Sequence, residues 1–152
     1  MKKTLLIACA LCMVSMASAQ FVAKLELKED VPGVCDKNEV YALFPSLKGQ
    51  KEPVCPVTKD EILNRLNSEV EFIKTNPKYN DKGMIGLIIS CKGEVVQCKM
   101  DNETKNKDLD KQIEAVFNSL GAWKAGELNG SAVDASMLFS FKIKNGKFSF
   151  DY

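Results

Sequence analysis

The sequence predicts an α+β protein in which two helices pack on one face of a small antiparallel sheet. Two amphipathic helical patterns, at residues 58–76 and 106–120, alternate with two hairpin patterns, at residues 84–100 and 137–152. Each pattern has one apolar side, and such sides are buried together when helices cover one face of a sheet. The chain of 152 residues, 45% of them hydrophobic, has the length and composition of one globular domain.

Both helical patterns carry start and stop signals. Thr58 and Glu61 form a capping box, in which the Thr58 hydroxyl accepts from the backbone N–H of Glu61, and Pro77 ends the pattern. The second pattern places Asp108 near the positive helix N-terminus, and Gly121 follows it as a C-terminal stop. Apolar residues recur three or four positions apart in both: Ile62, Leu66, Val70 and Ile73, then Leu109, Ile113, Val116, Phe117 and Leu120.

The first hairpin pattern predicts a definite register. A two-residue turn at Lys92 and Gly93 pairs Ile89 with Val96, Leu87 with Cys98 and Ile85 with Met100, which places these six residues on one face. This register also separates Cys91 from Cys98 by about 13 Å along the ladder, at ~3.3 Å per residue. A disulfide needs Cα atoms within about 7 Å, so we expect no bond between these two cysteines.

The second hairpin is the clearest local signal. Asn145-Gly146 is the preferred pair for a type I′ turn, and both flanks alternate between apolar and polar residues. The predicted pairs, which bury one aromatic face, are Ile143 with Phe148, Phe141 with Phe150, and Phe139 with Tyr152.

Residues 1–19 have the composition of a signal peptide. Two lysines precede an apolar stretch, and Ala17 and Ala19 provide small residues before a cleavage point at Gln20. We therefore expect a periplasmic or secreted protein whose mature form does not span the membrane. An uncleaved anchor and lipidation of Cys9 are the alternatives.

The mature chain divides into an extension, residues 20–56, and a domain, residues 57–152. The extension holds one strand pattern, at residues 21–27, followed by an irregular segment rich in proline and glycine. Cys35 and Cys55 bracket that segment, and disulfides are the first expectation for an exported chain. We predict a Cys35–Cys55 bridge that staples this loop. Zinc is the alternative, although the cysteine spacing does not suit it.

Composition excludes several classes of chemistry. The chain has no histidine, which rules out triads of the Ser-His and Cys-His type and histidine-ligated metals. No phosphate-binding or calcium loop is present, so we expect no enzyme activity, cofactor or metal. Carboxylate or thiolate catalysis is the alternative, although the acidic cluster at residues 101–110 is interleaved with lysines, as on a solvated surface. The near-neutral net charge of the chain does not favour binding to nucleic acid or to an anionic membrane.

Three stretches resemble the C-terminal domain of TonB-type energy transducers. Residues 83–96, with Cys-Lys-Gly-Glu-Val at the turn, are similar to the first hairpin of that family, and residues 109–113 look like its second helix. Residues 122–130, followed by Val133 and the Phe-rich strand, resemble the "W-x-P-G-x-x-N-G-x-x-V" tail common in Bacteroidetes versions. The similarity covers about residues 62–150.

The resemblance implies binding rather than catalysis. A TonB domain adds an extended segment of an outer-membrane receptor to the edge of its sheet, through backbone hydrogen bonds. By position, the partner-binding edge strand would comprise Met137, Leu138, Phe139, Ser140, Phe141, Lys142 and Ile143. We therefore expect an accessory binding module for TonB-dependent transport, with a secreted structural, interaction or inhibitory protein as the alternative. We do not expect force transmission, since the chain shows no long Pro-rich linker.

Overall fold

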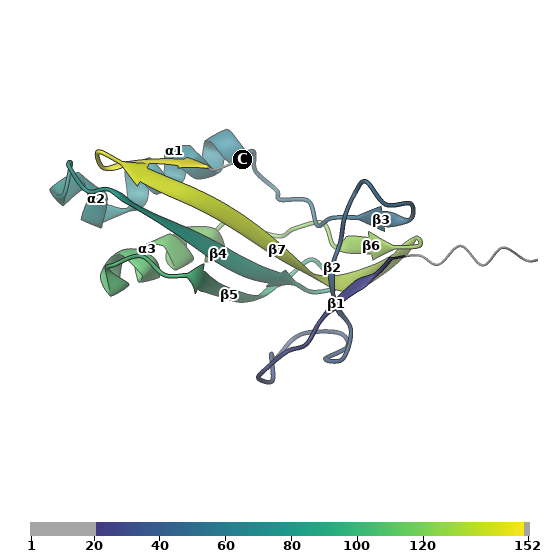
Figure 1. Cartoon of the computed structure of the whole chain (residues 1–152). Coiled ribbons are helices and arrows are strands. Elements are labelled where there is room, and N and C mark those ends of the chain that lie inside the picture. The colour runs from purple at the N-terminus through teal and green to yellow at the C-terminus, as the bar shows by residue number, and fades with distance from the viewer. Residues whose placement is uncertain (1–20, 151–152) are drawn as a thin grey trace, which may run out of the picture.

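The computed structural model describes residues 21–150, in which the chain forms eight strands and three short helices (Figure 1). In chain order these are β1 (Ala23–Leu25), β2 (Val40–Ala42), β3 (Gln50–Lys51), α1 (Lys59–Glu69), α2 (Glu71–Thr75), β4 (Asp81–Ile89), β5 (Val95–Asn102), α3 (Lys107–Asn118), β6 (Gly126–Leu128), β7 (Ser131–Lys144) and β8 (Lys147–Phe150). The predicted signal peptide lies outside the described residues, and so does the predicted pair of Phe139 with Tyr152.

The predicted fold class is wrong. Instead of two helices on a small antiparallel sheet, the protein is mostly a curled, mixed sheet of eight strands with the order β1-β2-β7-β4-β5. The strand β2 runs parallel to β7, and β3, β6 and β8 attach beside this path. The difference arises from β7, which is 14 residues long and extends back to Ser131. Its added length pairs with β6 and with β2, which lies in an N-terminal segment that was expected to be irregular beyond residue 27.

Both helix starts are confirmed. The Thr58 side chain accepts a hydrogen bond from the Glu61 N–H at 3.2 Å, and the Asn106 side chain caps α3 by accepting from the N–H groups of Asp108 and Leu109. The first helical pattern is interrupted at Val70, whose extended backbone (ψ 102°) separates α1 from α2. The apolar stripe nevertheless stays intact, because Val70 and Ile73 are both buried beside Ile62 and Leu66.

The main core lies between the helices and one face of the long strands. It joins the apolar stripes of α1, α2 and α3 to alternate residues of β4, β7 and β8, among them Ile85, Leu87, Phe139, Phe141, Ile143 and Phe148. Two smaller apolar clusters bind the N-terminal segment to the sheet: Val31 and Val40 with Ile88, and Tyr41 and Leu43 with Ala135.

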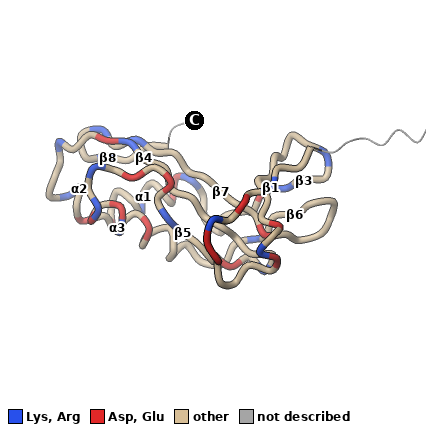
Figure 2. The backbone as a smooth tube through the Cα atoms, turned by 60° about the horizontal axis from the view of Figure 1, so that its bottom comes forward, with Lys and Arg blue, Asp and Glu red and all other residues tan. Residues whose placement is uncertain are grey.

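The hairpin registers are largely as predicted. In the β7–β8 hairpin Phe141 pairs with Phe150 and Ile143 with Phe148. In the β4–β5 hairpin Leu87 pairs with Cys98 and Ile85 with Met100, but Ile89 pairs with Val95 rather than Val96. The shift arises because the turn has three residues, Cys91–Gly93, closed by the Ser90 N–H donating to the Glu94 carbonyl, and a bulge then restores the register. Charged residues of both signs are spread along the molecule (Figure 2).

Candidate functional site

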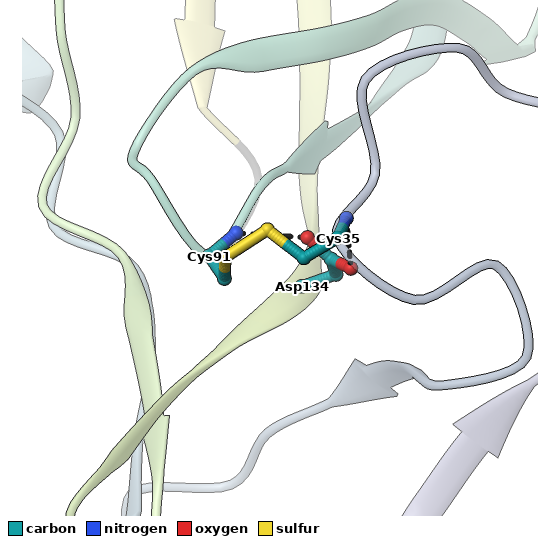
Figure 3. Close-up of side chains that lie close together, drawn as sticks. All are labelled: Cys35, Cys91 and Asp134. Atoms are coloured by element: carbon teal, nitrogen blue, oxygen red, sulfur yellow. Dashed lines mark hydrogen bonds between the residues drawn. A yellow bond between two sulfur atoms is a disulfide. The ribbon is translucent and has the colours of Figure 1, made fainter.

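A disulfide joins the N-terminal segment to the β4–β5 turn. Cys35 is bonded to Cys91, with 6.1 Å between the Cα atoms, and Cys55 and Cys98 are free thiols (Figure 3). The predicted Cys35–Cys55 bridge is therefore wrong, and the predicted absence of a Cys91–Cys98 bond is confirmed. The prediction placed Cys35 in a local loop with Cys55. In the structure, the pairing of β2 with β7 brings Cys35 next to the β4–β5 turn, which contains Cys91.

Asp134 of β7 holds both disulfide-bonded residues in place. Its carboxylate is buried, with 2% of the residue exposed, and accepts three backbone hydrogen bonds. The N–H groups of Cys35 and Asp36 donate to Oδ2 at 2.7 and 2.8 Å, and the N–H of Cys91 donates to Oδ1 at 2.8 Å (Figure 3). Sequence reasoning missed this residue. The one available signal was a charged side chain between small residues just before a strongly alternating strand.

The same three side chains have the composition of a metal site but not its chemistry. One ligand atom each of Cys35, Cys91 and Asp134 lie within 4.8 Å of one another. A metal would bind thiolates, whereas both sulfurs here are consumed in the disulfide, and the carboxylate is already engaged by three N–H donors. The cluster acts as a structural clamp.

The two free thiols are poor nucleophiles. Burial raises the pKa of the Cys98 thiol to about 12, and the nearby Glu114 carboxylate adds to the shift. Burial likewise raises the pKa of the Cys55 thiol. Since the thiolate is the reactive form, neither environment activates a cysteine at neutral pH.

The predicted partner-binding residues of β7 do not form an edge of the sheet. Residues 135–143 of β7 pair with β4 on one side. On the other side, residues 134–136 pair with β2 and residues 141–144 with β8. Phe141, Lys142 and Ile143 are thus bonded to strands on both sides. Met137, Leu138, Phe139 and Ser140 have no second partner strand within residues 21–150.

A groove of about 530 Å³ lies beside this short stretch. It is lined by Met137 and Phe139, by the start of α1 and by the apolar loop that precedes α1, where Val54 is 56% exposed. The stretch spans only four residues and is bounded at both ends by paired strands. A strand of ordinary length, about five or six residues, would collide with β2 or β8.

The other edge strands of the sheet differ in how far their backbone is blocked from pairing with a further strand. β1 has only three residues, which makes it a poor template. β8 is capped by a side chain, because Asn67 of α1 accepts from the Phe148 N–H at 2.9 Å and donates to the Phe148 carbonyl at 3.5 Å. β5 has eight residues, and among the described strands it pairs only with β4.

One hydrogen bond fixes which backbone groups of β5 face outward. The N–H of Met100 donates to the Glu114 carboxylate of α3 at 2.9 Å, so it points away from β4. Because alternate residues of a strand direct their backbone groups to opposite sides, the N–H and C=O of Cys98 also face outward, while those of Lys99 face β4. Glu114 therefore blocks one position of the β5 edge and leaves Cys98 open.

Comparisons with protein-family models, with curated proteins and with solved structures give no match to this chain. The resemblance to TonB C-terminal domains accordingly stays a prediction. No helix within residues 21–150 is both long enough and apolar enough to cross a bilayer.

Proposed function

We propose that this protein is a non-enzymatic binding module of the periplasm or the secreted fraction, which takes up an extended segment of a partner protein as a further strand along β5. The observation that carries the proposal is the outer edge of β5, an eight-residue strand that pairs only with β4 among the described strands and whose outer edge is occupied at Met100 by Glu114. Unpaired backbone groups at such an edge are a template for another strand.

The surroundings of β5 suit a rigid docking platform. Its partner β4 is held on its other side by β7 over nine residue pairs, and its inner face packs on the main core through Cys98 and Met100. A rigid edge loses little conformational entropy when a peptide adds to it, so the guest segment carries most of the ordering cost.

The partner class follows from the TonB resemblance, which implies extended segments of outer-membrane receptors. Such segments bind through backbone hydrogen bonds, and their alternate side chains give specificity. The exported location expected from residues 1–19 would bring the module and these receptors into the same compartment.

The test is amide exchange, measured by NMR, with eight-residue peptides tiled from outer-membrane receptor segments as probes. In the free protein we expect the Cys98 amide to exchange much faster than the neighbouring Lys99 amide, which is bonded to β4. A bound peptide should slow exchange at Cys98 and leave Lys99 unchanged. Equal protection of both amides in the free protein would show that the edge is closed, and peptide-induced protection confined to other strands would move the site elsewhere.

A further inference from the structure

Four lysines are directly opposed on the sheet face that the helices do not cover. Lys82 of β4 pairs with Lys142 of β7, and Lys144 of β7 pairs with Lys147 of β8. The alternate residues Phe141, Ile143 and Phe148 are buried on the helix side, so the four lysines lie on the opposite face, where all are exposed. We call this quartet, Lys82, Lys142, Lys144 and Lys147, the lysine face.

The arrangement is electrostatically unfavourable in the isolated protein. Like charges directly opposite each other in a sheet are destabilising, and here two such pairs occupy neighbouring positions. Within residues 21–150, Lys82, Lys144 and Lys147 form no ion pair with a carboxylate. The adjacent Asp81 is engaged elsewhere, since it accepts from the Tyr79 hydroxyl and from the Lys105 N–H.

The rest of this face presents an exposed apolar side chain and no aromatic ring of β7 or β8 among the described residues. Leu138 is 59% exposed and lies on the same face, in line with Ser140, Lys142 and Lys144 along β7. The aromatic residues of β7 and β8 within the described chain all lie on the helix side, which leaves no platform for stacking nucleic-acid bases. Figure 2 shows basic residues at the end of the molecule where β4 and β8 lie.

We propose that the lysine face docks on a membrane surface rich in anionic phospholipid headgroups. Charge complementarity would relieve the repulsion between Lys144 and Lys147, and long lysine side chains can reach phosphates while Leu138 meets the headgroup region. The net charge of +1 gives little long-range attraction, so binding depends on this local cluster rather than on the whole chain. The proposal does not rest on strand addition at β5.

The test is co-sedimentation of the full-length protein with vesicles of phosphatidylglycerol and phosphatidylcholine, against vesicles of phosphatidylcholine alone. The double variant Lys144→Gln/Lys147→Gln should bind the anionic vesicles about 25-fold more weakly, at about fivefold for each lysine near the surface. The matched control Lys37→Gln/Lys48→Gln removes the same charge from exposed lysines outside this face, and should change binding less than twofold. Any membrane affinity of residues 1–20 is common to all the proteins compared.

Thermal melting separates the proposal from misfolding. Removing one of the repelling pairs should leave the melting temperature of Lys144→Gln/Lys147→Gln equal to or above that of the wild type. Equal losses of vesicle binding in the two double variants would overturn the proposal, as would equal binding of the wild type to both kinds of vesicle. Full competition by inorganic phosphate at constant ionic strength would also overturn it, because the face would then serve a soluble ligand.

Discussion

At the residue scale, Asp134 of β7 joins the N-terminal segment to the β4–β5 turn. Its carboxylate accepts three backbone N–H groups, two from the N-terminal segment and one from the β4–β5 turn. The substitution Asp134→Ala leaves all three donors without an acceptor. At about 1.5–3 kcal/mol for each of these part-buried hydrogen bonds to a charged group, we expect the free energy of unfolding to fall by about 3 kcal/mol or more.

Urea denaturation with the disulfide intact measures this loss. Asp36→Ala is the control, because the exposed Asp36 side chain accepts a single hydrogen bond, from the Asn38 N–H, and should cost under about 1 kcal/mol. Similar losses in the two variants would show that Asp134 is not the clamp.

Tyr79 gives the molecule a dependence on alkaline pH. Burial, and then the hydrogen bond to Asp81 at 2.7 Å, raise the pKa of the Tyr79 hydroxyl to about 12. The unfolded value is about 10, so the folded state holds this proton more tightly. The stabilisation is complete below pH 10 and is lost as the pH rises from about 10 to about 12.

We expect Tyr79→Phe to reduce the fall in unfolding free energy over this pH range. Chemical denaturation at a series of pH values measures how the unfolding free energy of each variant falls with pH. Burial also raises the pKa of Tyr41, so Tyr41→Phe serves as the comparison and should keep the part of the pH dependence that belongs to Tyr79. The same slope in wild type and Tyr79→Phe would contradict the assignment.

At the element scale, the β7–β8 hairpin depends on a glycine in a confined turn. Gly146 has φ +67°, and an added Cβ would lie 3.0 Å from Cα of Pro77, a backbone atom that cannot rotate away. Gly130 has φ +84° with nothing within 4 Å of an added Cβ. Both alanine variants bear the left-handed backbone cost of roughly 1–2 kcal/mol, but only Gly146→Ala also meets a neighbour.

Gly146→Ala should therefore destabilise the protein by about 1–3 kcal/mol more than Gly130→Ala, the range typical of overpacking. Thermal or chemical denaturation of both variants gives the difference. Equal losses would indicate that the turn moves away from Pro77 at no cost.

At the scale of the whole molecule, the sequence predicted structure formed by neighbouring residues correctly, but it did not predict the pairing of distant segments. The capping box at Thr58 and the turn at Asn145-Gly146 depend on residues close in sequence, and both were predicted correctly. The strand β1 lies within the strand pattern predicted at residues 21–27, but β2 and β3 have three and two residues, too few for the alternation that identifies a strand. The parallel pairing of Val40 with Asp134 joins distant segments, and no local pattern encodes it.

The lack of a local signal for long-range pairing also explains why the candidate site was predicted wrongly. The binding edge was assigned to residues 137–143 by their position in the TonB resemblance, whereas the strands that enclose β7 come partly from the N-terminal segment. The predicted Cys35–Cys55 bridge failed for this reason too. Asp134 and Glu114 were missed because their acceptor roles exist only after the sheet has assembled.

The Cys35–Cys91 disulfide tests this account of the assembly. It links residues 56 positions apart, and closing a loop of that length in the unfolded chain corresponds to about 4 kcal/mol of stabilisation. We expect the double variant Cys35→Ser/Cys91→Ser to lose about this much unfolding free energy. Its unfolding free energy should also fall more steeply with urea concentration, because the unfolded chain becomes more expanded. Cys55→Ser, which alters a half-buried free thiol, is the control and should cost under about 1.5 kcal/mol.

Because Asp134 still accepts from both backbones and Val31 and Val40 remain packed on Ile88, the Cys35 and Asp36 amides should stay protected from exchange in the double variant. Loss of that protection would mean that the disulfide, rather than the carboxylate and the apolar cluster, fixes the N-terminal segment to the sheet.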